Sequence, residues 1–413
     1  MVKNIYYKVL LLVCVLAFFP CAIKYSRIHE TKRYPESQME SGLIHVSKKQ
    51  VQKKNILIPL NKKKVHNVKL TTVKQKVTRN NIAQNAMTVR SWPVWKENTS
   101  TDDLFAWLKD LKNNYRAQNK YNVTYIWKNV SAKLSQQELL CELKTRVPLV
   151  MIKAGDGPFK REDWQKYFPT EDLNKRFENL KRCAVVSSAG SLKNAKLGAE
   201  IDDHDAVIRF NGAPTDGYSI DVGNKTSIRI VNSQLVYDKQ HNFLTNPLYQ
   251  TGVLILWDPA PYKQDLQHWY SNPDYPFFER YREYRKKHPE QLFYITNPVM
   301  QWNLWDIIQE NSLEEIQPNP PSSGMQGIVL MMSLCDVVNV YEFLPSKRQT
   351  DVCYYYRQVY NKACTMGAYH PLMYEKNLVK KMNQGTDHDI FHYGRVTLPG
   401  FRNVHCSAKA MQT

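Results

Sequence analysis

Continuous apolar runs alternate with segments of helical composition between residues 183 and 343, and this pattern limits the fold most strongly. Strands are predicted over 183–190, 206–212, 227–234, 252–259, 292–298 and 337–343, and helices over 191–205, 302–310 and 325–335. The strand runs lack alternating polar residues, which is typical of strands buried on both faces of a parallel sheet. The sequence therefore predicts a single α/β domain with a mostly parallel, Rossmann-like sheet. In such sheets ligands bind at the carboxyl ends of the strands.

An apolar segment at residues 9–23 lies between Lys8 and Lys24. It is short for a membrane span, but lysines at both ends can snorkel to the interface and extend it. A cleaved signal peptide is the alternative, although no A-x-A cleavage site follows the segment. We therefore expect a signal-anchor transmembrane segment at 9–23. Residues 1–8 would form a cytoplasmic tail, and the rest of the chain would lie in the lumen of the secretory pathway.

The positive charge is concentrated near the N-terminus. Of the formal net charge of +19, residues 24–90 contribute +13 and residues 91–413 only +4. A strongly basic protein invites a nucleic-acid function, but here the folded part is nearly neutral, and we expect no nucleic-acid partner. Residues 24–91 are predicted to be a basic stem that acts as a solvated tether, with a heparin- or nucleic-acid-binding arm as the alternative.

Sequons and cysteines support a lumenal body. Four Asn-x-Ser/Thr sequons, which are candidates for glycosylation, begin at Asn98, Asn122, Asn129 and Asn224. Six cysteines follow the apolar segment, namely Cys141, Cys183, Cys335, Cys353, Cys364 and Cys406. They contain no C-x-x-C, so disulfides are favoured over a zinc site, and the spacing alone leaves their pairing open.

Two small-residue segments are candidates for ligand contact. Residues 187–191 follow the first predicted strand without forming a G-x-G-x-x-G or Walker motif. Asn211 and Asn232 end the next two strands and can hydrogen-bond a polar ligand, with turn formation as the alternative for Asn211. Before the helix at 325, Ser322 or Ser323 can cap the helix or help its first amides to face a phosphate.

His370 is the candidate general base. It lies between Tyr369 and Pro371 and is followed by Glu375 and Lys376, although a single histidine is more often structural. The D-x-D within residues 202–205 falls at a helix-to-strand junction, which favours a structural role over a metal site.

Four segments together resemble the eukaryotic sialyltransferases. They are residues 183–234, 321–343, 354–357 and the His-x4-Glu of 370–375, within a similarity that extends over 92–406. The resemblance implies a glycosyltransferase-A-like variant fold and a lumenal catalytic domain at 92–413. It also implies transfer of sialic acid from CMP-sialic acid to the 6-hydroxyl of a terminal galactose on N-acetyllactosamine glycans of glycoproteins. No cofactor or essential metal is expected. Residence in the Golgi membrane is implied, while a homodimer and a secreted form after stem cleavage stay open.

The same resemblance assigns roles to single residues. His370 would be the catalytic base, and Gln234 and Asp274 would contact the acceptor. The donor and substrate contacts would be Ser188, Asn211, Asn232, Ser322, Ser323, Gly324, Cys353, Tyr354, Thr365, Tyr369 and Lys376. The implied disulfides are Cys141–Cys406, Cys183–Cys335 and Cys353–Cys364.

Two other classes of protein are alternatives to this function. One is a non-catalytic glycan- or heparin-binding receptor, and the other is a Ser–His hydrolase, for which the G-x-S-x-G elbow is missing.

Overall fold

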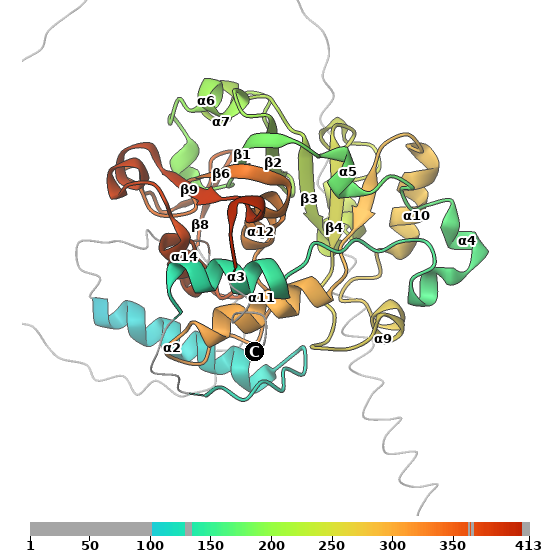
Figure 1. Ribbon diagram of the computed structural model, residues 1–413, viewed down its shortest axis with the longest axis horizontal. Helices are drawn as coiled ribbons and strands as arrows, with labels where there is room; N and C mark the ends of the chain where they lie inside the picture. The colour runs from blue at the N-terminus through green and yellow to red at the C-terminus, as the bar shows by residue number, and fades with distance from the viewer. Residues whose placement is uncertain (1–100, 129–133, 362–363, 365–366, 407–413) are drawn as a thin grey trace, which may run out of the picture. The chain divides into compact units, whose positions relative to one another are not determined.

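A seven-stranded sheet forms the centre of the fold in the computed structural model, which describes residues 101–128, 134–361, 364 and 367–406 (Figure 1). The strand order is β5-β4-β3-β2-β1-β6-β9, and all neighbours are parallel except β6 and β9. The strands are β1 (Leu180–Val186), β2 (Ala206–Phe210), β3 (Ile228–Asn232), β4 (Val253–Trp257), β5 (Phe293–Ile295), β6 (Cys335–Tyr341) and β9 (Arg395–Pro399). The predicted α/β class and mostly parallel sheet are therefore confirmed.

Several predictions fall outside the described residues: the tail, the apolar segment at 9–23, the stem, the sequons at Asn98 and Asn129, and Thr365. Within the part of the chain that the structure describes, no helix has the length and apolar character needed to cross a membrane.

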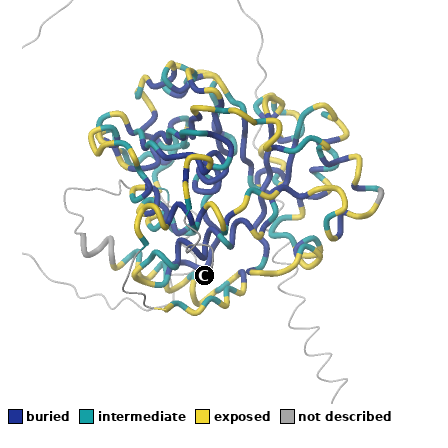
Figure 2. Tube along the Cα trace, in the orientation of Figure 1, coloured by how far each residue is buried: buried dark blue, intermediate teal, exposed yellow. Residues whose placement is uncertain are grey.

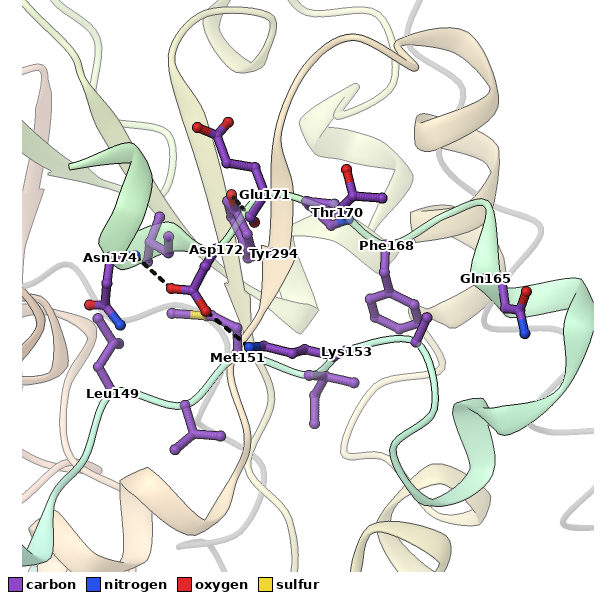
Figure 3. Close-up of a pocket in the computed structure, with 15 residues that line it drawn as sticks. Leu149, Met151, Lys153, Gln165, Phe168, Thr170, Glu171, Asp172, Asn174 and Tyr294 are labelled. Carbon is purple, nitrogen blue, oxygen red and sulfur yellow. Dashed lines mark hydrogen bonds and ion pairs between the residues drawn. The ribbon is translucent and has the colours of Figure 1, made fainter. Parts of the chain in front are cut away.

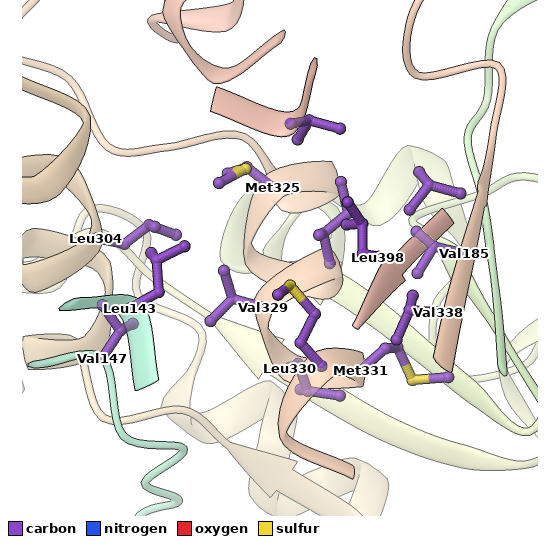
Figure 4. Close-up of a cluster of buried hydrophobic side chains, with 14 of the residues drawn as sticks. Leu143, Val147, Val185, Leu304, Met325, Val329, Leu330, Met331, Val338 and Leu398 are labelled. Atoms are coloured by element: carbon purple, nitrogen blue, oxygen red, sulfur yellow. The ribbon is translucent and has the colours of Figure 1, made fainter. Parts of the chain in front are cut away.

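The largest core lies on one face of the sheet, beneath α12 (Ser323–Leu334). This helix packs on β1, β2, β3 and β6. Around it lie α3 (Gln136–Arg146), α11 (Val299–Glu310) and α14 (Leu372–Met382), which contact one another. Figure 4 shows this cluster, in which Met325, Val329 and Met331 of α12 meet Val185 and Val338 of the strands.

The opposite face of the sheet is covered by two further clusters. Val185 points into the core beneath α12, while its neighbours Ala184 and Val186 belong to a cluster with Tyr341 and Tyr355. An aromatic cluster covers β4 and β5 and includes residues of α9 (Leu266–Ser271) and α10 (Phe278–Lys287). The central strands are thus covered on both faces, and Figure 2 shows that most of their residues are buried. The remaining elements are α2 (Thr101–Gln118), α4 (Glu162–Gln165), α5 (Leu173–Arg176), α6 (Gly198–Asp202), α7 (Ser219–Val222), α8 (Ser233–Tyr237), β7 (Val352–Tyr354) and β8 (Arg357–Tyr360).

The predicted helix over 191–205 is mostly wrong. Only α6 and a single 3-10 turn at Gly190–Leu192 are helical in this stretch. The carboxylate of Asp221 accepts hydrogen bonds from the backbone N–H groups of Asn194 and Lys196, and both of these residues have positive φ. The Asp221 side chain thus accepts the backbone N–H groups that would donate within a helix, and the chain forms turns there instead.

All three disulfides that the resemblance implies are present. Cys141–Cys406 joins α3 to the C-terminal segment, Cys183–Cys335 joins β1 to β6, and Cys353–Cys364 joins β7 to the chain just after β8. Their Cα–Cα distances are 5.6, 6.2 and 5.4 Å, within the range that disulfides occupy.

Loss of the Cys183–Cys335 bond, by the paired change to alanine, should lower the free energy of unfolding by about 2–5 kcal/mol. This bond joins residues 152 positions apart, whereas Cys353–Cys364 joins residues 11 apart. Because closure entropy grows with loop length, the paired change at Cys353 and Cys364 should cost about 2 kcal/mol less. Urea unfolding of the oxidised proteins measures both losses, and equal losses would contradict the expectation.

Candidate active site

The predicted site residues gather where parallel strands end. Asn211 follows β2 in a left-handed conformation (φ 48°), and its Oδ1 accepts the backbone N–H of Asn232 at 3.1 Å. The Oδ1 of Asn232 in turn accepts the N–H of Leu235 at 2.9 Å and caps α8. The turn interpretation of Asn211 is therefore confirmed. Since each amide uses its oxygen in the fold, the Nδ2 group is what each can offer a ligand.

The start of α12 is fixed by its first two serines. Ser322 is the helix cap, because its Oγ accepts the N–H of Met325 at 3.1 Å. The Oγ of Ser323 accepts the indole N–H of Trp257 at 2.9 Å, which fastens the helix to the end of β4. The first amides of an α-helix have no partner within the helix and carry the positive end of its dipole. The backbone N–H groups of Ser323 and Gly324 are thus suited to an anion.

A row of hydrogen bonds holds residues 317–322 against residues 367–375, and we call this row the polar clamp. Gln317 Nε2 donates to the carbonyl of Gly367 at 3.1 Å, and Asn319 Nδ2 donates to that of Tyr369 at 2.8 Å. Gln317 and Asn319 were missed by the sequence analysis, because no local sequence pattern indicates hydrogen bonds to residues fifty positions away.

Glu375 completes the polar clamp. Its carboxylate accepts the backbone N–H of Ser322 at 2.7 Å and its hydroxyl at 2.5 Å. Glu375 is fully buried, and burial raises its pKa to about 7 even though the hydrogen bonds from Ser322 and the charge of Lys376 lower it. The two motifs at 321–343 and 370–375 are therefore parts of one site.

His370 is held in a form that suits a base. Its Nδ1 lies 2.7 Å from the carbonyl oxygen of Pro320, and because a carbonyl can only accept, Nδ1 carries the proton. The lone pair of the neutral ring is then on Nε2. Burial lowers the pKa of His370 to about 4, so the ring is uncharged at neutral pH. The rings of Trp257 and Tyr369 flank it, with centroids at 6.2 and 4.8 Å.

Lys376 faces the loop that follows β1. It lines a small cavity of about 80 Å³ together with Gly190, Ser191 and the Cys353–Cys364 disulfide. Burial lowers the pKa of Lys376, and the neighbouring Glu375 partly offsets this effect.

The β7–β8 hairpin packs on the loop after β1. The N–H of Tyr355 donates to the carbonyl of Ser188 at 3.3 Å. Gly190 lies directly against the carbonyl of Val352, which leaves no room for a side chain. Tyr354 stacks on Tyr356 with ring centroids 5.4 Å apart. The structure thus brings Ser188 and Tyr354, both predicted substrate contacts, to the same hairpin.

The predicted acceptor residue Asp274 and the predicted substrate contact Tyr369 meet through Tyr121, a residue that the sequence analysis did not single out. The hydroxyl of Tyr121 bonds that of Tyr369 and lies 3.4 Å from a carboxylate oxygen of Asp274. Lys120 pairs with Asp274 at 2.5 Å. Gln234, the other predicted acceptor contact, is exposed on α8, which borders the Asp274 loop through a Tyr237–Tyr275 contact at 6.2 Å.

The acidic run at 202–205 plays a structural role at its junction. Asp202 accepts the backbone N–H groups of Asn224 and Lys225, and Asp205 accepts those of Lys181 and Arg182. In the described ranges, no three metal-ligating side chains come together.

Asn122 and Asn224 are both exposed, as glycosylation would require.

A separate cavity of about 470 Å³ lies at the β5 edge of the sheet, and Figure 3 shows its lining. Lys153 pairs there with Asp172 at 2.9 Å, and the hydroxyl of Tyr294 donates to the carbonyl of Glu171. None of its lining residues belongs to the site described above.

Residues 160–386 match glycosyltransferase family 29 (sialyltransferase). The chain is 56% identical over 316 residues to human beta-galactoside alpha-2,6-sialyltransferase 1, covering 76% of this chain and 78% of that one. The mouse enzyme of the same name is 54% identical with the same coverage. A solved mammalian sialyltransferase matches at 19% identity and a TM-score of 0.35, over 65% of this chain and 80% of that one.

The chain therefore belongs to glycosyltransferase family 29, the sialyltransferases. It is a glycosyltransferase, and enzymes of this family transfer sialic acid from CMP-sialic acid to glycan acceptors.

Replacement of Glu375 by alanine should lower the free energy of unfolding by about 1–3 kcal/mol, because the N–H and hydroxyl of Ser322 lose their acceptor. The matched control is Asp387→Ala, which removes a carboxylate that is 85% exposed and should cost about 0.5 kcal/mol or less. Urea unfolding measures both losses of free energy. Equal losses in Glu375→Ala and Asp387→Ala would show that the polar clamp does not depend on Glu375.

Burial of His370 predicts a loss of stability in mild acid. Its pKa is about 4 in the folded protein against an ordinary 6.5, so between these values only the unfolded chain binds the proton. The contribution of neutral His370 to the free energy of unfolding is fully present above pH 6.5. It is lost as the pH falls through 4, by about 3 kcal/mol in total.

Unfolding free energies of wild type and His370→Gln at pH 6.5 and 4.5 measure this loss. Glu375 acts in the opposite sense, because its raised pKa favours the folded state at lower pH. The informative quantity is therefore the difference between the two proteins, and the variant should lose less stability on acidification. An equal loss in both would contradict the assignment to His370.

Proposed function

We propose that this chain transfers sialic acid from CMP-sialic acid to the 6-hydroxyl of terminal galactose in Gal-β-1,4-GlcNAc units of glycoprotein glycans. The names of its relatives, which specify a beta-galactoside and an alpha-2,6 linkage, support this choice of acceptor and bond. The observation that carries the mechanism is the bond from Nδ1 of His370 to the carbonyl of Pro320, because it leaves a neutral ring with a basic Nε2.

The reaction would be a single displacement with inversion at the anomeric carbon. The galactose 6-oxygen attacks that carbon while the bond to the phosphate oxygen of CMP breaks. His370 takes the proton of the hydroxyl on Nε2, and CMP leaves with the electron pair of the broken bond. Electrons and protons balance without a co-reactant.

Charge on the departing phosphate would be stabilised by groups that the fold already holds in place. The backbone N–H groups of Ser323 and Gly324 lie at the start of α12, and Lys376, which is half-buried and lines a cavity with Gly190, adds a cation. The Nδ2 groups of Asn211 and Asn232 would bind the nucleoside part of the donor, and Tyr369 and Asp274 the galactose.

The proposal extends to the architecture and the compartment. The mostly parallel sheet supports a glycosyltransferase-A-like variant fold. Three disulfides and the exposed sequons at Asn122 and Asn224 support a lumenal catalytic domain. It would be carried on a stem at 24–91 and a Golgi signal anchor at 9–23. Removal of N-linked sugars by endoglycosidase from sealed vesicles, before and after detergent, tests this topology.

The full chain, incubated with CMP-sialic acid and N-acetyllactosamine, should form a product in which sialic acid is linked to O6 of galactose. Linkage analysis of the purified trisaccharide by NMR measures the outcome. A product linked at another hydroxyl would contradict the α-2,6 assignment, and the absence of any product from the disulfide-bonded protein would contradict the proposed function.

In the same assay His370→Ala should lower kcat by about 10²–10⁴-fold, because a positioned base contributes that much to proton transfer. The Michaelis constant for CMP-sialic acid should change little. His388→Ala is the matched control, since it removes an exposed histidine that directly precedes the π-helical turn at Asp389–Tyr393, and it should keep full activity. Near-normal turnover of His370→Ala would exclude His370 as the base.

A further inference from the structure

A cavity of about 800 Å³ lies between α2, the loop after α11 and the first turns of α14. Its lining includes Lys112, Arg116, Trp127, Glu314, Tyr374 and Asn377. The proposed mechanism uses none of these side chains. The sequence analysis singled out none of them either, because they come from three segments that lie far apart in the sequence.

The cavity borders the reaction site, because residues of both are in contact or adjacent in the chain. Gln317 lines the cavity and donates to the carbonyl of Gly367 within the polar clamp. Tyr115, which precedes Arg116 in α2, packs edge-on against Tyr369 with ring centroids 5.9 Å apart. Tyr374 lies four residues after His370. A ligand anchored at Tyr369 would therefore have this cavity directly beside it.

Four of the five charged side chains that line the cavity form ion pairs with one another, and the fifth, Lys109, is exposed. Lys112 pairs with Glu314 at 2.5 Å, and Arg116 pairs with Glu315. The hydroxyl of Tyr374 donates to Glu314 at 2.5 Å. The lining holds cations and carboxylates together, and its ion pairs engage groups of both signs, so the arrangement favours a neutral ligand that can both donate and accept hydrogen bonds.

Amide and aromatic groups complete this chemistry. Asn113 and Asn377 are exposed amides, and Trp127 and Tyr374 are half-buried rings. Hydrogen-bonding groups fix the orientation of a ligand, while ring faces bury its apolar C–H surface. Sugars present hydroxyls and C–H faces together, so this lining fits a neutral oligosaccharide.

We infer that the cavity binds sugar residues of the acceptor glycan that lie beyond the terminal galactose and N-acetylglucosamine. The inference rests on the proposed function, because it assumes that the terminal galactose is held at Tyr369 and Asp274. It assigns Trp127 and Asn377 to selection among acceptors of different size and gives them no part in the chemical step.

The test compares two acceptors on the full-length enzyme: free N-acetyllactosamine and a released biantennary N-glycan, at equal concentrations of terminal galactose. Trp127→Ala should raise the Michaelis constant for the biantennary glycan about fivefold, the size expected from loss of one aromatic contact. The constants for the disaccharide and for CMP-sialic acid should stay unchanged. Trp127→Phe, which keeps an aromatic face, should recover most of the loss.

Two further variants keep the result interpretable. Asn377→Ala, on the exposed side of α14, should show the same dependence on acceptor size even if Trp127→Ala folds poorly. Ile126→Ala is the matched control, because Ile126 is 81% exposed, adjacent to Trp127 and outside the cavity lining, and it should leave both acceptors unaffected.

The outcomes separate this inference from the proposed function. Wild type that transfers to both acceptors, with variants that affect both equally or neither, overturns the cavity assignment alone. Wild type that transfers to neither acceptor overturns the proposed function and the inference with it. A loss confined to the biantennary glycan supports both.

Discussion

The buried carboxylate of Glu375 is the contact on which the site depends. By accepting both the N–H and the hydroxyl of Ser322, it joins the cap of α12 to α14 across fifty-three residues of sequence. Two features of the proposed chemistry meet at this junction: the first amides of α12, and His370, which the neighbouring carbonyl of Pro320 orients. A buried carboxylate is costly unless it is hydrogen-bonded, so the fold tolerates Glu375 only while the junction stays closed.

The parallel sheet explains why polar side chains from distant segments can serve one ligand. Neighbouring parallel strands end at the same edge, which places Asn211, Asn232 and Trp257 side by side. Each of them also has a structural bond: Asn211 to the backbone of Asn232, Asn232 to α8, and Trp257 to Ser323. The interpretation of Asn211 as a turn residue is therefore compatible with its interpretation as a ligand contact. A residue that is fixed by one atom presents its other atoms in a defined direction.

Prediction from the sequence succeeded where the signal is local or belongs to a family motif. The strand at 206–212 was visible because its apolar run reflects burial on both faces, and the disulfides followed from the resemblance. The helix over 191–205 failed because Asp221, from another segment, takes its backbone donors. Tyr121 was missed for the same reason, since its partner Tyr369 lies 248 residues away. β9 was missed although Val396 and Leu398 alternate with polar residues, because the run is short and its antiparallel partner β6 lies far away in the sequence.

Burial acts on three neighbouring titratable groups in the same direction, against their charged forms. It lowers the pKa of His370 to about 4, raises that of Glu375 to about 7 and lowers that of Lys376. A phosphate bound at the start of α12 would bring negative charge to this site. That charge would raise the pKa of His370 and favour the ammonium form of Lys376. The histidine would thus become a stronger base only when the nucleotide donor is bound, and the proton of the attacking hydroxyl would have its acceptor at that stage.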